Sequence, residues 1–173
     1  MNLKNKKILF VVAPLNYRDE EFIEPRRILE SYNAKTTIAS KNCKEAKGML
    51  GSKVIINLDL ENVKVSEYDA IVFVGGSGSN VYWNDKTALN IAKEAYLKGK
   101  IVASICMATG ILANAFLLRG IKSTGWEDTK ELVEKNGGIY TGNDVEISGR
   151  IVTALGPKFA KDFGEAIANA LNK

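Results

Sequence analysis

The chain has 173 residues, 46% of them hydrophobic, which suits one buried core and a single domain over residues 1–173. Its 24 basic and 20 acidic residues are interspersed and leave a net charge of +4, so no basic stripe points to nucleic acid as a partner. It has no histidine and only two cysteines, which rules out imidazole catalysis and leaves no spacing for a zinc site. The apolar runs are too short to cross a membrane, and the basic N-terminus lacks the cleavage site of a signal peptide, so we expect a cytoplasmic protein without a membrane partner.

Predicted strands and helices alternate along the first part of the chain. Residues 7–13 are continuously apolar after the first position, as in a strand buried on both faces, and Pro14 ends the run. The helix that follows carries Glu20 and Glu21 in its first turn, where the helix dipole favours acidic groups. The expected elements are a strand over 7–13, a helix over 20–32, a strand over 35–40 and a β-hairpin within 44–59.

The second part of the chain repeats this alternation. The expected elements are strands over 70–74 and 100–105, helices over 89–97, 111–118, 127–135 and 158–171, and short paired strands at 145–147 and 151–153. Strands that alternate with helices indicate a parallel sheet with helices on both of its faces. The sequence therefore predicts an α/β fold.

One cysteine stands out by its position. Cys106 directly follows the strand over 100–105 and precedes a helix, at the edge of the sheet where reactive groups gather in such folds. A helix N-terminus stabilises a thiolate, so we expect the pKa of Cys106 to lie below that of a free thiol. The small residues Ala108 and Gly110 allow the close packing that a nucleophile elbow requires. The alternative is that Cys106 is a small apolar residue ending a strand, and Cys43, in a predicted loop, serves as a comparison.

A glycine-rich turn, residues 75–79, ends the neighbouring predicted strand. It lacks both the GxGxxG spacing and the lysine of a phosphate-binding loop. If the two strands are adjacent, the N–H groups of Gly76 and Met107 can face an oxyanion formed at the thiol. The alternative is an ordinary flexible turn. From the residues alone, Glu21 is explained equally well by the helix dipole.

Six segments carry a resemblance over nearly the whole chain: Glu21–Pro25, Val72–Gly76, Lys100–Cys106, Gly110–Ala113, Leu117–Thr124 and Ile151–Pro157. In this order they resemble the DJ-1/PfpI family, which comprises PfpI-like intracellular cysteine proteases and their DJ-1 relatives within the class I glutamine amidotransferase-like superfamily. The resemblance implies a flavodoxin-like three-layer sandwich with a mostly parallel central sheet and an added β-hairpin. It also implies a nucleophile-elbow cysteine at Cys106, an acidic partner at Glu21 and a homodimer. We expect backbone donors at Gly75, Gly76 and Met107, and neither a cofactor nor a metal.

The sequence departs from the family at each place where a proton carrier is expected. Met107 stands where the proteases have histidine after the cysteine, and Trp126 occupies the place of the histidine in the DJ-1 branch. Asn80 replaces a glutamate that the proteases supply from a neighbouring subunit. Trp126 is then a pocket residue, and Glu21, buried with a raised pKa, remains as the proton donor to the thiolate.

Three functions are compatible with these residues. The first is a cysteine-dependent enzyme of the protease/amidase or glyoxalase/deglycase type that acts on a small-molecule carbonyl or a peptide, with strong proteolysis disfavoured because histidine is absent. The second is a redox-sensing or stress-protective protein that works through oxidation of Cys106. The third is a structural or binding role in which the cysteine is idle.

Overall fold

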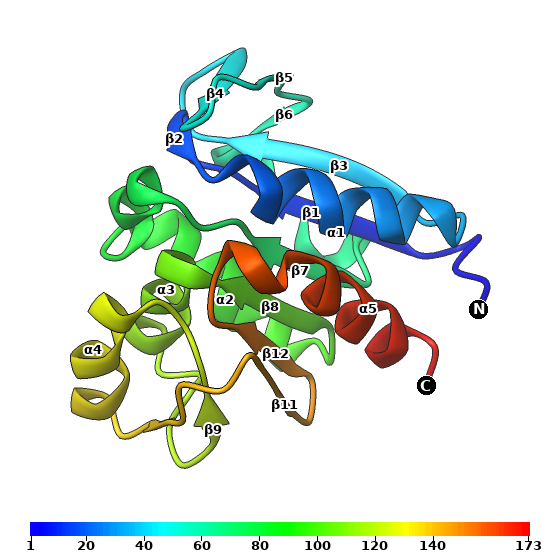
Figure 1. The fold of residues 1–173 in the computed structure, drawn as a ribbon. Helices are drawn as coiled ribbons and strands as arrows, with labels where there is room; N and C mark the ends of the chain where they lie inside the picture. Colours follow the sequence, from blue (N-terminus) through cyan, green and yellow to red (C-terminus); the bar gives the residue numbers. More distant parts are fainter.

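A seven-stranded sheet forms the middle layer of the computed structural model, which describes all of residues 1–173 (Figure 1). The strand order is β11-β12-β8-β7-β1-β3-β6, and all neighbours are parallel except β11 and β12. This confirms the mostly parallel sheet that the sequence predicts. The strands are β1 (Lys7–Val11), β3 (Lys35–Ser40), β6 (Leu58–Asp59), β7 (Ala70–Phe73), β8 (Ile101–Ile105), β11 (Val145–Ser148) and β12 (Ile151–Ala154).

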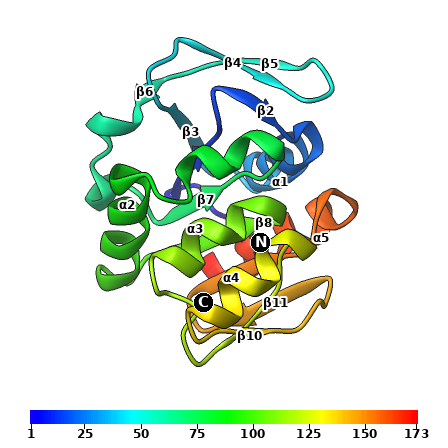
Figure 2. The ribbon, with the colours of Figure 1, turned by 90° about the vertical axis from the view of Figure 1, so that its left-hand side faces the viewer.

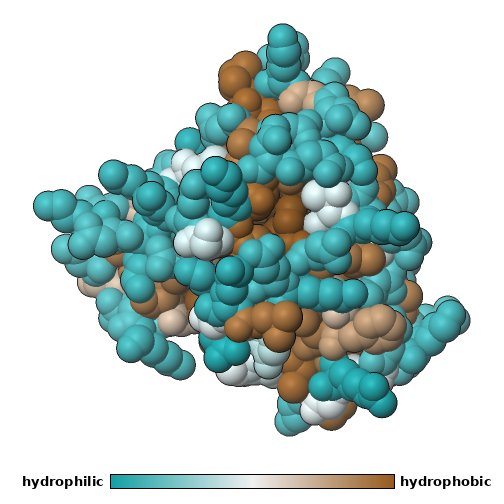
Figure 3. Space-filling view, turned by 180° about the vertical axis from the view of Figure 1, so that it is seen from behind, coloured by the Kyte–Doolittle hydropathy of each residue, from teal (hydrophilic) through white to brown (hydrophobic).

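Helices cover both faces of this sheet, as a flavodoxin-like sandwich requires (Figures 1 and 2). On one face α1 (Asp19–Ser31) packs against α5 (Ala160–Leu171), and on the other lie α2 (Lys86–Leu97) and α3 (Thr109–Asn114), with α4 (Lys130–Lys135) beyond α3. Figure 3 views the side opposite to that of Figure 1, where hydrophilic residues dominate and hydrophobic ones show mainly in a central hollow and along the lower edge. No helix combines the length and the apolar character needed to span a bilayer.

The alternation of side chains along the strands builds a separate core on each face. In β1, Ile8 and Phe10 join the core that contains Phe163 of α5, whereas Leu9 joins the core that contains Ile91 of α2. All three β1 residues have no exposed surface. This explains why the strand reads as one continuous apolar run.

The hairpin expected within residues 44–59 is confirmed, but it belongs to a larger unit. β4 (Glu45–Gly48) and β5 (Lys53–Ile55) pair antiparallel, and β4 also pairs with β2 (Leu15–Tyr17), a strand that the sequence analysis does not predict. Asp19, at the start of α1, accepts the backbone N–H groups of Leu50 and Ser52 at 2.7 and 2.9 Å and so fastens the hairpin turn to the main domain. A second small sheet pairs β9 (Lys122–Ser123) with β10 (Ile139–Tyr140).

Two predicted helix boundaries are wrong for identifiable reasons. The helix expected over 111–118 is instead α3, which ends at Asn114, because Phe116 adopts a φ of 59° that no helix accommodates. The helix expected over 89–97 begins earlier, at Lys86, because the Asp85 side chain accepts the N–H of Ala88 at 3.0 Å and caps it.

Candidate active site

Three segments meet where β1, β7 and β8 end. β8 runs directly into a 3₁₀ turn, η4 (Cys106–Ala108), and β7 is followed by Gly75 and Gly76 and then by η3 (Ser77–Tyr82). β7 pairs with β8 and with β1, so the glycine turn and the cysteine turn are neighbours. The start of α1 supplies the third segment.

Cys106 has the backbone conformation of a nucleophile elbow. Its φ is 60°, in a region that non-glycine residues adopt only at a cost of about 1–3 kcal/mol, and its side chain is buried. Hydrogen bonds on either side hold the turn: Thr109 bonds the Ser104 hydroxyl at 2.9 Å and donates to the Thr124 carbonyl at 3.1 Å. The carbonyl of Cys106 accepts the backbone N–H of Trp126 at 3.1 Å.

The side chains of the three acids that begin α1 have different surroundings. Asp19 holds the β4–β5 turn, and Glu20 forms an ion pair with Arg18 at 2.8 Å. Glu21 turns inward, has no exposed surface, and neither of its carboxyl oxygens has a hydrogen-bond partner. The helix dipole therefore explains the presence of acids here but not the orientation of Glu21.

Gly75 creates the space that Glu21 and Cys106 share. A Cβ at Gly75 would lie 2.3 Å from Oε2 of Glu21, 2.5 Å from the carbonyl oxygen of Ile105 and 2.8 Å from Cβ of Cys106. Any side chain at this position would collide with all three. The glycine thus allows the carboxyl and the thiol to approach each other across the end of β7.

Burial raises the pKa of Glu21 to about 8, although the Cys106 thiol, the charge of Arg18 and the Gly75 N–H act in the opposite direction. At neutral pH the carboxyl therefore carries a proton. The burial and the raised pKa are as expected, and the role of Glu21 as a proton donor stays a prediction.

The expectation of an acidic thiol is wrong. Burial raises the pKa of Cys106, and the nearby carboxyl of Glu21 would raise it further if it were ionised. The N–H groups of Met107 and Gly76 act on the sulfur in the opposite direction but do not outweigh burial. The helix that was expected to lower the pKa is only a 3₁₀ turn followed by the six residues of α3, so its dipole is small. The resting pair is a neutral thiol beside a neutral acid.

The N–H groups of Gly76 and Met107 both act on the sulfur of Cys106, and their role as oxyanion donors stays a prediction. Only glycine fits at position 76, because the backbone there has a φ of 101° and a Cβ would lie 2.3 Å from the backbone nitrogen of Arg18. Met107 presents its N–H from the elbow itself. The carbonyl oxygen of a substrate bonded to Cys106 would lie within reach of both groups.

A cavity of about 220 Å³ opens above Cys106. Trp126 and the half-buried Met107 form part of its wall. Asn80 is exposed on η3 and does not contribute. No group of three or more acids or cysteines is placed to hold a metal ion. The remaining lining residues, which the sequence analysis does not identify, are Arg18, Met49, Ser77, Asp128 and Pro157.

The DJ-1/PfpI family model matches residues 6–170. The chain belongs to this family. It is 38% identical, over 99% of its length and 85% of the relative's, to an uncharacterized protein of Methanocaldococcus jannaschii. It is 31% identical, over 87% of its length and 90% of the relative's, to the deglycase PH1704 of Pyrococcus horikoshii. The crystal structure of a ThiJ/PfpI domain protein from Brachyspira murdochii superposes with a TM-score of 0.94 at 37% identity, covering 96% of each chain.

Proposed function

We propose that this protein is a cysteine-dependent enzyme of the glyoxalase or deglycase type that acts on small carbonyl compounds. One observation carries the proposal: a buried, protonated Glu21 lies against Cys106 with both carboxyl oxygens free of other partners. A carboxylic acid with two free oxygens can give a proton from one and accept a proton at the other. The kinship with a deglycase supports the same assignment.

This bifunctional acid fits the addition of a thiol to an aldehyde. The sulfur of Cys106 bonds to the aldehyde carbon while Glu21 gives its proton to the carbonyl oxygen and accepts the thiol proton, so that a neutral hemithioacetal forms. The N–H groups of Gly76 and Met107 stabilise the oxygen while it carries charge. Because each transfer exchanges one proton for another, no preformed thiolate is required, and the raised pKa of Cys106 is compatible with the reaction.

With a 2-oxoaldehyde the same exchange continues. Glu21 accepts the proton on the carbon bonded to sulfur and gives one to the adjacent ketone oxygen, and a second exchange converts the enediol into the thioester of a 2-hydroxy acid. Water then cleaves the thioester, releasing the acid and restoring the thiol. Methylglyoxal plus water thus becomes lactate. The cavity of about 220 Å³ suits a substrate of this size.

Amide hydrolysis fits the site poorly. It requires a proton for the leaving amine, and a positioned acid or base contributes about 10²–10⁴-fold to such steps. Met107 and Trp126 offer no proton, and the buried Glu21 faces the thiol. We therefore propose that peptides are at most weak substrates.

The second candidate is a redox sensor. Its support is that Glu21, protonated and unpartnered, can donate a hydrogen bond to an oxidised sulfur at Cys106. A sensor would react once with peroxide, gain two oxygens and show no turnover.

One pair of measurements separates the two. Wild type and Cys106→Ser are incubated with methylglyoxal, and separately with dilute peroxide, while substrate loss, lactate formation and intact mass are followed. We expect wild type, but not Cys106→Ser, to make many equivalents of lactate. If wild type makes none and only gains two oxygens, the sensor is correct and the enzyme is not.

We also propose that the protein is a homodimer located in the cytoplasm. The location is supported by two free cysteines, which suit a reducing compartment. The dimer is supported by exposed apolar side chains that gather on β2, the β4–β5 hairpin and η3, beside the cavity. They are Leu15, Met49, Leu50, Ile55 and Val81. Light scattering should give twice the chain mass for wild type and a monomer for Leu15→Lys combined with Val81→Lys, and a monomeric wild type would refute the dimer.

A further inference from the structure

The short helix η3 connects the two backbone donors of the candidate site. It begins after Gly76, whose N–H faces the sulfur of Cys106. It ends at Tyr82 and is followed by Trp83, whose backbone N–H bonds the carbonyl of Asn80 at 3.1 Å. The indole Nε1–H of Trp83 then donates to the carbonyl oxygen of Met107 at 2.8 Å. One end of η3 thus carries the first donor, and the other end holds the residue that carries the second.

Residues of α3 hold Trp83 both at its backbone and at its ring. The Nδ2 of Asn114 donates to the backbone carbonyl of Trp83 at 2.7 Å, and Asn136 in turn donates to Oδ1 of Asn114 at 3.2 Å. The indole ring lies directly against Gly110, where a Cβ would come within 2.5 Å of both Cε2 and Nε1. A half-buried Trp83 held at its backbone carbonyl, its ring and its indole N–H has little freedom to move.

We propose that Trp83 is a positioning residue that holds Met107 so that the Met107 and Gly76 N–H groups face the Cys106 sulfur together. Met107 follows a residue with a φ of 60°, and the Trp126 N–H already holds the peptide between the two at the Cys106 carbonyl. The indole, from a different element, holds the next peptide at the Met107 carbonyl, so Met107 is anchored on both sides. The expected effect on turnover rests on the proposed carbonyl chemistry. The expected effect on the reactivity of the Cys106 thiol does not.

The test compares Trp83→Phe with Tyr82→Phe in a Cys43→Ser background. Trp83→Phe keeps an aromatic ring beside Gly110 but removes the N–H donor. Tyr82→Phe removes a buried hydroxyl from the preceding residue of η3, which bonds the carbonyl of Val12 and not the elbow. It therefore controls for a general loosening of η3. The rate of Cys106 alkylation against pH is measured for each variant, together with kcat and KM for methylglyoxal.

In Trp83→Phe we expect Cys106 alkylation to slow about threefold at each pH, because a misplaced donor stabilises the thiolate less. We expect kcat to fall about tenfold with KM unchanged, less than the 10²–10³-fold that removal of an oxyanion donor costs. Tyr82→Phe should change neither quantity. If alkylation slows as expected but wild type does not turn over methylglyoxal, the positioning role stands and the proposed function fails.

A folded Trp83→Phe variant with wild-type alkylation and kcat would overturn the proposal. If that variant does not fold, Gly110→Ala decides the question. Alanine normally favours a helix over glycine, but here its Cβ would displace the indole from Met107. Gly110→Ala should slow alkylation about as much as is expected of Trp83→Phe. A folded Gly110→Ala variant with wild-type alkylation would overturn the proposal equally.

Discussion

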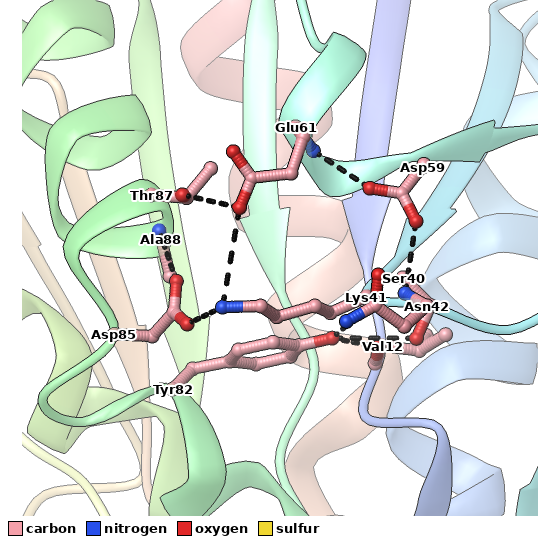
Figure 4. A network of polar contacts seen from close by, with 10 residues as sticks. All are labelled: Val12, Ser40, Lys41, Asn42, Asp59, Glu61, Tyr82, Asp85, Thr87 and Ala88. Carbon is pink, nitrogen blue, oxygen red and sulfur yellow. Dashed lines mark hydrogen bonds and ion pairs between the residues drawn. The ribbon is translucent and has the colours of Figure 1, made fainter.

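Two clusters of polar side chains lie at the same edge of the central sheet, and they differ in whether their acidic side chains have hydrogen-bond partners. In the first, Lys41 forms ion pairs with Asp85 and Glu61 (Figure 4). The Tyr82 hydroxyl there donates to the carbonyl of Val12 at 2.9 Å and accepts the N–H of Lys41 at 3.1 Å. In the second, the Cys106 site, the buried carboxyl of Glu21 has no hydrogen-bond partner.

The pKa values follow this difference. Burial alone would raise the pKa of Asp85, but hydrogen bonds from Lys41 and from the Ala88 N–H bring it below its ordinary value. Glu21 lacks partners of this kind, so burial raises its pKa to about 8. The partly buried Asp85, which has partners, fastens elements of the fold, whereas the buried Glu21, which has none, is left able to exchange protons. This difference alone, without any comparison to related proteins, distinguishes the Lys41 cluster, which stabilises the fold, from the Cys106 site, which is suited to catalysis.

The largest effect is expected from closing the space that the second cluster needs. Gly75→Ala places a Cβ 2.3 Å from Oε2 of Glu21 and 2.5 Å from the carbonyl oxygen of Ile105, and the backbone cannot yield. We expect a loss of about 3 kcal/mol in the free energy of unfolding and no measurable turnover. Urea unfolding and a methylglyoxal assay check both. A stable, active Gly75→Ala variant would mean that Glu21 and Cys106 do not need their close approach.

Glu21→Gln sharpens the comparison through the pH dependence of stability. The folded carboxyl keeps its proton up to about pH 8, whereas the unfolded one releases it near its ordinary pKa of 4.5. The unfolded state therefore binds fewer protons in this window, and wild type should lose about 3 kcal/mol of stability between pH 5 and pH 8 through this group. Glutamine does not titrate, so its variant should lack that loss.

Urea unfolding of both proteins at pH 5 and pH 8 makes the comparison. We expect the Gln variant to be the more stable of the two at pH 8. If both proteins lose stability in parallel as the pH rises, Glu21 is ionised in the folded protein.

A smaller effect is expected in the first cluster. Tyr82→Phe leaves the Val12 carbonyl and the Lys41 N–H without the hydroxyl and should cost about 1–2 kcal/mol in the free energy of unfolding. Turnover of methylglyoxal should stay at the wild-type level, because this cluster performs no chemistry. A substantial fall in kcat without a fall in stability would show that the two clusters are coupled.

Much of the fold can be predicted from the sequence because the central strands are buried on both faces. Residues 8–13 and 70–74 read as continuous apolar runs, and the structure places β1 and β7 there. β2, β9 and β10 escape prediction because two or three residues carry no period. The early end of α3 depends on a left-handed residue, Phe116, whose side chain gives no sign of it.

The residues of the candidate site also divide into those that local sequence predicts and those that depend on the tertiary fold. Cys106 can be found from sequence because it directly follows a predicted strand, and Gly76 and Met107 because they lie in the turns after two such strands. Met49 cannot, because it reaches the cavity through the hairpin packed on β2. The pKa of Cys106 is misjudged because local sequence indicates a helix start but not the depth of burial, and burial dominates here.

The most direct test of the central claim is the pH profile of methylglyoxal turnover by wild type and Glu21→Gln. If a neutral acid exchanges protons with a neutral thiol, kcat/KM of wild type should be flat below pH 8 and fall as Glu21 ionises near that value. Glu21→Gln, which cannot exchange protons, should be at least about 100-fold slower at neutral pH. A wild-type kcat/KM that instead rises through pH 8, with the Gln variant close behind, would show that a thiolate formed without Glu21 is the nucleophile and would contradict the account.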